Sequence, residues 1–332
     1  MLFSVIIPVY NRPDEVRDLL DSLLAQKACN FEVIIVEDGS TIPCSRQCED
    51  ARAAGLDVKY FHKDNEGRSI ARNYGMERAK GDYFVFFDSD CVIPPEYFET
   101  LSKVLAEHPT DCYGGPDAAH SSFTNTQKAI NYTMTSFLTT GGIRGGKLAL
   151  EKFTPRTFNM GFSRRVYETV GGFREMFSED IDMSKRIARA GFATSLIADA
   201  PVWHKRRVDF RKFLRQVYVF GMSRITLKLL YPESLKVVHT LPAVAVLLAV
   251  VMVVLAIMVS PWWLLPIGIY LVAVYVMALA ATHSVVIAAK AVPAAIIQLG
   301  GYGTGFIQAY VSKIVLRRGR DVNREIEMRR GK

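Results

Sequence analysis

Five apolar residues stand directly before two carboxylates in the stretch Tyr83-Phe84-Val85-Phe86-Phe87-Asp88-Ser89-Asp90. A short run that is apolar throughout is typical of a strand in a sheet that is covered on both faces. Folding requires no carboxylates at the end of such a strand. Carboxylates two residues apart can instead place one group on a divalent cation and the other on a neighbouring hydroxyl. The stretch therefore predicts a buried strand that ends at a binding site.

Short β-rich runs alternate with helical stretches through the first 115 residues. The runs expected to be strands are Ser4–Val9, Phe31–Val36, Val58–His62 and Tyr83–Phe87. The stretches expected to be helices are Pro13–Gln26, Pro43–Ala54, Ser69–Lys80 and Pro94–Glu107. This alternation predicts an α/β fold with a mostly parallel sheet, whose ligands bind at the carboxyl ends of the strands.

Polar residues also follow two other expected strands, in Tyr10-Asn11-Arg12 and in Glu37-Asp38-Gly39-Ser40. A single Asp after a strand often only caps the next helix. Several polar strand ends at one edge of one sheet are much harder to explain by capping. We therefore expect these residues to share a ligand.

The net charge of +8 is divided unevenly along the chain. Residues 1–203 carry 28 acidic and 23 basic side chains, whereas residues 204–332 carry 18 basic and 5 acidic ones. A nucleic-acid-binding protein would not separate its charges so sharply, and the basic half surrounds long uncharged stretches. This pattern indicates anionic lipid headgroups as partners and excludes nucleic acid. Five cysteines, an odd number, without a signal peptide predict a reducing compartment for the acidic half.

Residues 237–289 contain no Asp, Glu, Lys or Arg over 53 positions. Because about 20 apolar residues cross a bilayer, we expect two transmembrane helices, over 237–259 and 264–289, separated at Ser260-Pro261-Trp262-Trp263. The next uncharged stretch, 291–312, has a glycine-rich centre that would make a poor lipid-facing helix. Basic clusters on both sides of these stretches favour two spans with cytoplasmic ends and a re-entrant or interfacial third segment. A third crossing is the alternative.

Five segments, in this order over residues 2–205, resemble the motifs of family 2 glycosyltransferases. They are Ser4–Arg12, Val33–Ser40, Asn65–Asn73, Gly81–Asp90 and Val170–Met183. The resemblance implies a GT-A fold and an inverting transfer from a nucleoside-diphosphate sugar. A nucleoside diphosphate that leaves develops negative charge, which a divalent cation stabilises. Inversion takes a single displacement, so one carboxylate base on the acceptor side suffices.

The resemblance also implies roles for individual residues. Those expected to bind the nucleotide and donor sugar are Pro8, Tyr10, Arg12, Asp38, Arg72, Asp88 and Ser89. Asp90 would hold Mn²⁺ or Mg²⁺, and His204 would complete the metal site. Asp180 would deprotonate the acceptor hydroxyl, with Glu179 and Asn159 facing the acceptor. Each role has a plainer alternative: acids favour the start of a helix such as 181–190, and a lone His after an apolar run is usually a packing residue.

Residues 205–236 hold nine Lys and Arg, and their aromatic and aliphatic residues can share one helical face. This pattern predicts a basic amphipathic helix on the cytoplasmic leaflet. Four of its arginines follow the expected metal ligand, and we expect them to clamp the phosphate of a polyprenyl-linked acceptor: Arg206, Arg207, Arg211 and Arg215. The stretch Arg215–Arg224 lacks the Q-x-x-R-W motif of processive family members, which favours addition of one sugar per acceptor.

The expected organisation has four parts. A GT-A domain spans 1–204, an interfacial helix 205–235 and two transmembrane helices 236–289, and 290–332 is a re-entrant or interfacial segment with a basic cytoplasmic tail. We expect a multi-pass protein of a bacterial inner membrane with its catalytic domain in the cytoplasm. A UDP-sugar is favoured over a GDP-sugar as donor, and the pocket that selects hydroxyl groups is expected within 110–160. A donor-binding pseudoenzyme, a sugar nucleotidyltransferase and a tethered enzyme with a soluble acceptor are the alternatives.

Overall fold

The computed structural model describes residues 1–27, 30–118, 123–141, 153–204, 209–319 and 321–322, and for His204 the backbone alone. These residues form two compact units. The first, which we call the sheet unit, contains the described residues of 1–120 and 153–204. The second, which we call the helical unit, contains the described residues of 121–152 and 206–328.

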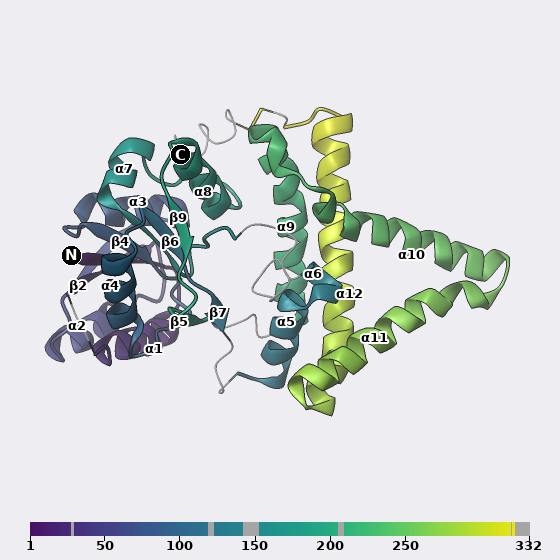
Figure 1. Cartoon of the computed structure of the whole chain (residues 1–332), viewed down its shortest axis with the longest axis horizontal. Coiled ribbons are helices and arrows are strands. Elements are labelled where there is room, and N and C mark those ends of the chain that lie inside the picture. The colour runs from purple at the N-terminus through teal and green to yellow at the C-terminus, as the bar shows by residue number, and fades with distance from the viewer. Residues whose placement is uncertain (28–29, 119–122, 142–152, 205–208, 320, 323–332) are drawn as a thin grey trace. The chain divides into compact units, whose positions relative to one another are not determined.

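A seven-stranded sheet in the order β3-β2-β1-β4-β8-β6-β9 forms the centre of the sheet unit (Figure 1). Its strands are β1 (Phe3–Val9), β2 (Phe31–Asp38), β3 (Val58–Lys63), β4 (Tyr83–Phe86), β6 (Cys112–Gly114), β8 (Met160–Ser163) and β9 (Thr194–Leu196). The first four strands pair in parallel, β9 pairs in parallel with β6, and β8 runs antiparallel to β4 and β6. The expected α/β fold with a mostly parallel sheet is confirmed.

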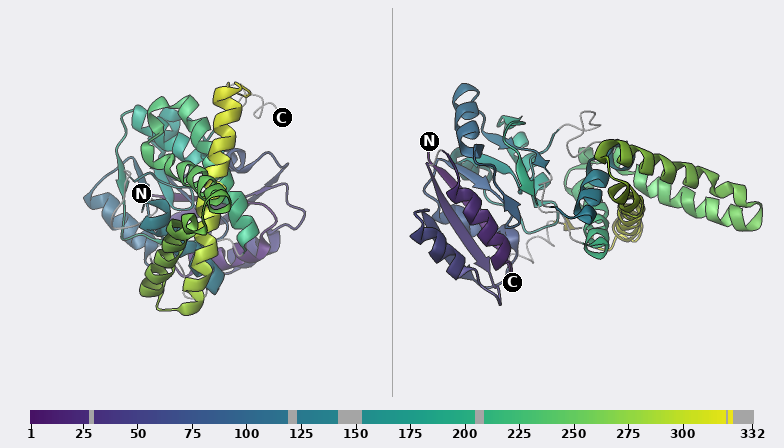
Figure 2. Two further views of the ribbon diagram at one scale, coloured as in Figure 1. Left: turned by 90° about the vertical axis from the view of Figure 1, so that its right-hand side faces the viewer. Right: turned by 90° about the horizontal axis from the view of Figure 1, so that it is seen from below.

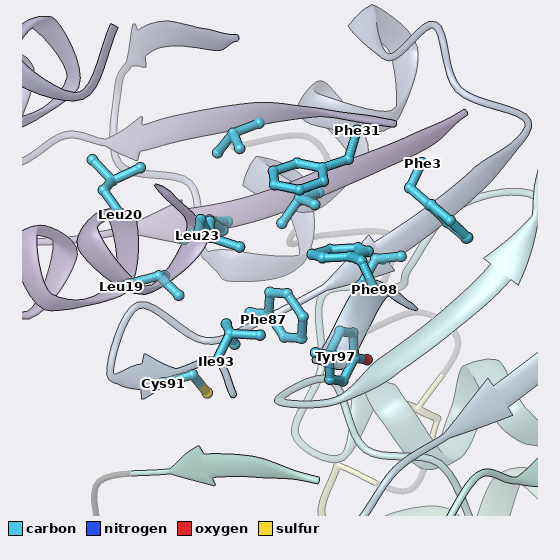
Figure 3. Close-up of a cluster of buried hydrophobic side chains, with 14 of the residues drawn as sticks. Phe3, Leu19, Leu20, Leu23, Phe31, Phe87, Cys91, Ile93, Tyr97 and Phe98 are labelled. Carbon is cyan, nitrogen blue, oxygen red and sulfur yellow. The ribbon is translucent and has the colours of Figure 1, made fainter. Parts of the chain in front are cut away.

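Helices cover both faces of this sheet because successive strand residues point to opposite sides. On one side, Val5 and Ile7 of β1 join a core completed by α1 (Pro13–Leu24), α2 (Ser45–Ala53) and α4 (Tyr97–Glu107). On the other side, Ile6 joins a core completed by α3 (Arg68–Arg78), α7 (Arg164–Val170) and α8 (Glu179–Arg189). Figure 3 shows part of the first core, in which the rings of Phe31 and Phe98 stack with centroids 4.4 Å apart.

A smaller sheet, in the order β5-β10-β7, lies beyond the acidic strand end. It is formed by β5 (Cys91–Val92), β7 (Asp117–Ala118) and β10 (Val202–His204). The backbone of His204 pairs with Cys91, the residue directly after Asp90. This register brings the His204 position next to the predicted metal-binding segment.

The helical unit consists of α5 (Asn125–Thr135), α6 (Phe137–Thr140), α9 (Phe210–Leu230), α10 (Leu241–Met258), α11 (Leu265–Thr282) and α12 (Val285–Ala309). Short helical turns complete it: η1 (Pro232–Ser234), η2 (Val237–His239), η3 (Pro261–Leu264) and η4 (Tyr310–Val315). Helices α10 and α11 are joined through η3 and spread apart from it in the view of Figure 1, whereas they overlap in the right-hand view of Figure 2. The chain enters this unit between β7 and β8, forms α5 and α6, and then returns to the sheet unit. Residues 1–204 thus contribute to both units, where we expected one domain.

Among the described residues, three helical segments are long and apolar enough to cross a membrane: Leu241–Met258, Pro261–Thr282 and Val285–Val315. We expected two spans and placed the end of the second at residue 289. The second helix instead ends at Thr282, where His283 adopts a left-handed conformation with φ 50°. The Ser284 side chain then accepts a hydrogen bond from Ile287 N and caps α12, so Lys290 lies inside the third helix.

The glycine-rich stretch that we expected to be re-entrant or interfacial lies within α12 and packs against other helices. A Cβ atom on Gly305 would lie 2.1 Å from the Tyr218 carbonyl oxygen, and one on Gly221 would lie 2.1 Å from the Tyr302 carbonyl oxygen. On another side of α12, a Cβ on Gly303 would lie 2.5 Å from the Pro242 carbonyl oxygen. Small residues allow helix backbones to approach this closely. Gly305 therefore faces α9 and Gly303 faces α10, and the helix continues through both.

Helix α9 also differs from the expected interfacial helix. Phe213 and Val217, both on its expected apolar face, are fully buried against α5 and α12. Leu214 on the same face is 46% exposed. Protein side chains therefore cover much of the face that we assigned to the bilayer. An amphipathic pattern predicts that one face is buried, but it does not distinguish burial in lipid from burial in protein.

Candidate functional site

The carboxyl ends of β1, β2 and β4 bring the predicted donor residues to one edge of the sheet (Figure 1). Arg12, three residues after β1, reaches across to the carboxylate that follows β4. Its Nη1 donates to Asp90 Oδ2 over 2.5 Å. Burial lowers the pKa of the Arg12 guanidinium, but the charge and hydrogen bond of Asp90, together with the charges of Glu15 and Asp88, outweigh it and leave the pKa above its usual value. The sequence predicted this edge, but not the ion pair.

Asp88 pairs with a second arginine, Arg72, which is 1% exposed. Arg72 Nη2 donates to Asp88 Oδ1 over 2.8 Å, and Arg72 Nη1 donates to Glu179 Oε1 over 3.0 Å. The other oxygen of Glu179 accepts from Arg68 Nη2 over 2.8 Å. Two carboxylates and two guanidiniums thus form a chain of ion pairs between the end of β4 and the start of α8.

In this series of ion pairs, Arg72 and Glu179 hold neighbouring side chains of the site in place. Arg72 fixes the carboxylate of Asp88. The Asp88 side chain is 34% exposed, whereas that of Glu179 is 3% exposed. Glu179 is 2% exposed and carries a charge of the same sign as a phosphate, so it is unsuited to bind an acceptor phosphate directly. Arg68 was missed in the sequence, although its spacing of four residues from Arg72 places both on one face of α3.

The predicted base, Asp180, follows Glu179 in the first turn of α8. Ser178, directly before them, has φ 64°, a conformation that costs free energy for a residue other than glycine. The Asp180 side chain is 15% exposed, and Arg156 Nη1 lies 3.4 Å from its Oδ2. The buried contacts of Glu179 therefore anchor the turn that presents the Asp180 carboxylate.

Asp38 organises the loop that leads into α3. Its carboxylate accepts hydrogen bonds from Lys63 Nζ over 3.0 Å, from Glu66 N over 3.0 Å and from Gly67 N over 2.8 Å. Asp38 is 5% exposed. These bonds fix the approach to Arg68 and Arg72, and contact of Asp38 with a nucleotide base stays a prediction.

The remaining donor residues differ in accessibility. Tyr10 is 52% exposed directly after β1, where its ring is available for stacking. Pro8 lies within β1 opposite Val36, and Ser89 is 6% exposed between the two carboxylates. Their contacts with a nucleotide stay predictions.

Asn159 lies inside the fold. It is 0% exposed, and its Oδ1 accepts from the Tyr97 hydroxyl over 2.6 Å. Its Nδ2 donates to the carbonyl oxygens of Ala200 over 2.8 Å and Pro116 over 3.3 Å. These bonds tie together the strands around the small sheet, and they give no support to the expected acceptor contact.

The structure describes two of the four arginines expected to bind the acceptor phosphate. Arg211 and Arg215 lie on α9 of the helical unit and are exposed. Arg206 and Arg207 lie outside the described residues, as does the side chain of His204. Their predicted roles are carried into the proposal below.

Asp88 and Asp90 suit a hard divalent cation. Mg²⁺ commonly takes one or two carboxylates and completes its shell with substrate phosphates and water. Within the described ranges no three His, Cys, Asp or Glu side chains gather as a ready metal site. A pair of carboxylates whose remaining ligands come from a diphosphate is compatible with that observation.

The Glycosyl transferase family 2 model matches residues 4–171, just over half of the 332-residue chain. The chain belongs to this family. The glycosyltransferase GlyA of Streptococcus pneumoniae is 38% identical over 108 residues, which are 32% of this chain and 16% of GlyA. The uncharacterized glycosyltransferase YibD of Escherichia coli is 38% identical over 108 residues, 32% of this chain and 31% of YibD. The matched segment is thus less than a third of the length of each.

A solved structure supports the fold over most of the chain. The mannosyltransferase PcManGT of Pyrobaculum calidifontis, in complex with GDP-Man and Mn²⁺, covers 94% of this chain and 86% of its own. The TM-score is 0.57 at 18% identity, a likeness of fold. The sheet unit of this family 2 glycosyltransferase therefore has the GT-A-like architecture expected from its motifs.

Proposed function

We propose that the protein is a metal-dependent inverting glycosyltransferase that moves one sugar from a nucleoside-diphosphate sugar, a UDP-sugar, to a polyprenyl-linked acceptor. Transfer takes place at the cytoplasmic leaflet of a bacterial inner membrane. Family membership supports the class of reaction. The Mn²⁺ and GDP-Man of the fold neighbour support a metal and a nucleotide sugar. They do not support uracil as the nucleotide base, because the neighbour's donor carries guanine. The acceptor rests on one observation in the helical unit.

That observation is the packing of α5, which lies within 110–160, the segment expected to hold the pocket that selects hydroxyl groups. Ala129 lies in one cluster with Ala278 of α11 and Ala288 of α12. The next residue, Ile130, lies in a second cluster with Phe213 of α9. The part of the chain between β7 and β8 is thus built onto helices apolar enough to cross a membrane. A soluble acceptor requires no such arrangement, whereas a lipid-linked one is reached only at the membrane.

A polar contact reinforces this packing. Lys290 lies among apolar residues of α12, and its Nζ donates to Thr126 Oγ1 over 2.8 Å. On α9, the exposed Arg211 and Arg215 provide guanidinium groups suited to a lipid phosphate. Arg206 and Arg207 belong to the same proposed set.

In this mechanism the chain's own residues bind, orient and accept a proton. Asp180 accepts the proton of the attacking acceptor hydroxyl, and the oxygen displaces the nucleoside diphosphate in one inverting step. Arg72 and Glu179 hold Asp88 and the α8 turn in register. Asp90, with His204, would hold Mn²⁺ or Mg²⁺, which would neutralise charge on the leaving diphosphate.

The test uses the full chain in nanodiscs with UDP- and GDP-sugars and measures both nucleoside diphosphate release and sugar transfer. We expect release to stop in EDTA, to return with Mn²⁺, and to rise with polyprenyl-phosphate-type acceptors but not with free sugars. Asp90→Ala should lower turnover by about 100-fold or more. Full activity in EDTA would contradict the metal assignment.

Charge reversal separates an acceptor role from a tether. Arg211→Glu with Arg215→Glu should lower transfer to lipid by about 10-fold or more while slow donor hydrolysis persists. Lys103→Glu, on an exposed position of α4, is the matched control and should leave both unchanged. Equal transfer to water-soluble acceptors would reduce the helical unit to a tether, and no turnover with any nucleotide sugar would favour a donor-binding scaffold.

A further inference from the structure

The contact between Arg12 and Asp90 occupies the carboxylate that the proposed function assigns to a metal. Asp90 is 8% exposed, and its Oδ2 lies 2.5 Å from Arg12 Nη1. A carboxylate withdrawn this far from water requires a compensating positive charge. In this structure Arg12 provides it.

The loop that carries Arg12 is fixed in place. Asn11 adopts a left-handed conformation, φ 52°, and its backbone N donates to Ser40 Oγ over 2.8 Å. Asn11 Oδ1 accepts from the backbone N of Thr41 over 2.8 Å and of Ile42 over 2.9 Å. The helix α1 begins at the next residue after Arg12, Pro13, whose φ is restricted. The backbone on both sides of Arg12 is therefore held in place, and this fixed loop starts the Arg12 side chain close to Asp90.

Arg12 differs from Arg72, the other arginine of this acidic edge. Arg72 is 1% exposed and bridges Asp88 and Glu179, so it cannot leave without opening the core. The Arg12 side chain is 31% exposed. It can therefore turn away from Asp90 toward a new anionic partner, at the cost of one ion pair.

We propose that Arg12 is the resident counter-ion of Asp90, which excludes a bare divalent cation and moves to the donor diphosphate when cation and nucleotide arrive together. The proposal rests on the proposed function, in which Asp90 is a metal ligand. A cation at Asp90 with Arg12 still in place would be repelled by the guanidinium. A nucleoside diphosphate adds negative charge beside the same carboxylate and offers Arg12 a bidentate partner. Metal binding thus becomes conditional on nucleotide binding.

This conditionality is a coupling that can be measured without turnover. If UDP raises the affinity for Mn²⁺ by some factor, Mn²⁺ must raise the affinity for UDP by the same factor. Arg12 contributes to that factor because it opposes Mn²⁺ alone but favours the diphosphate. Removal of Arg12 should therefore tighten Mn²⁺ binding without nucleotide and shrink the coupling from both directions.

The experiment measures Mn²⁺ binding to the full chain by electron paramagnetic resonance, with and without UDP or GDP. We expect Arg12→Gln to bind Mn²⁺ alone about 10-fold more tightly than the unsubstituted chain, and the enhancement by nucleotide to fall by a similar factor. Arg12→Lys, which keeps the charge, should lie close to the unsubstituted protein. Lys27→Gln removes the exposed pair with Glu96 and should change nothing.

Two further measurements fix the interpretation. The thermal unfolding midpoint of each variant shows that the comparison is between folded proteins, and Asp90→Asn should abolish Mn²⁺ binding with or without Arg12. Unchanged or weaker Mn²⁺ binding in Arg12→Gln, with loss in Asp90→Asn, would overturn the role of Arg12 and leave the proposed function standing. Mn²⁺ binding that survives Asp90→Asn would overturn the metal site and this inference together.

Discussion

The sheet unit and the helical unit bury their interiors in opposite ways. In the sheet unit large side chains fill the core, as the stacked rings of Phe31 and Phe98 illustrate. In the helical unit the closest contacts exist because side chains are missing, at Gly221 and Gly305. The carboxylates of the predicted donor site, Asp38, Asp88 and Asp90, lie at strand ends of the sheet unit. Substitution of a charge there should alter chemistry more than folding, whereas one added methyl group on the α9–α12 contact should do the reverse.

The largest effect is expected at Asp180. Asp180→Asn keeps the shape of the side chain but cannot accept the acceptor proton, so sugar transfer should fall by about 10² to 10⁴. Nucleotide affinity, measured by calorimetry in nanodiscs, should stay within about twofold because the carboxylate is assigned no donor contact. Loss of nucleotide affinity together with transfer would make Asp180 a donor-site or structural residue.

Asp182 is the matched control for Asp180 in the same helix. It is 0% exposed and holds Arg174 at 3.3 Å and Arg186 at 2.9 Å. Breaking a buried ion pair by neutralising one partner should lower the free energy of unfolding by roughly 3 kcal/mol. Asp182→Asn should therefore lower the thermal midpoint, whereas Asp180→Asn should lower transfer at a nearly unchanged midpoint.

The sequence predicted most of the sheet unit because its signals are local. The apolar run before Asp88 predicted a strand over 83–87, and the structure has Tyr83–Phe86. The alternation of short strands and helices then determined the edge at which Asp38 and Asp90 would lie. The contact of Arg72 with Glu179 joins residues 107 positions apart, and no local pattern could specify it.

The helical unit was harder to predict because apolar sequence does not distinguish lipid from protein as its surroundings. The 18-residue windows of α10 and of the α11 span are 6% and 11% buried inside the structure, whereas that of the α12 span is 39% buried. All three have membrane-like composition. The glycines of α12 indicated a surface unsuited to lipid, which we explained by a re-entrant or interfacial segment and not by a neighbouring helix.

Gly305 tests the α9–α12 contact with one methyl group. Its Cβ would meet the backbone oxygen of Tyr218 at 2.1 Å, and backbone in a helix cannot move aside as a flexible side chain can. Gly305→Ala should therefore lower the free energy of unfolding by about 1 to 3 kcal/mol, the range for overpacking. The thermal midpoint in nanodiscs should fall, while nucleotide affinity in the folded protein should be retained. An unchanged midpoint would show that α9 and α12 do not approach as closely as described.

Gly300 provides the smallest effect and the sharpest control, because it lies in the same helix. A Cβ there would meet no other atom within 4 Å. Alanine is favoured over glycine inside a helix by up to about 1 kcal/mol, so Gly300→Ala should leave the thermal midpoint unchanged or raise it slightly. The two variants add the same methyl group to the same helix, five positions apart. If both lowered the midpoint equally, the cause would be a general intolerance of α12 to alanine, and the comparison between filled and glycine-lined interiors would lose its basis. If only Gly305→Ala lowers the midpoint, the loss of stability reports the contact with α9. It then shows that the helical unit requires glycine where the α9 and α12 backbones meet.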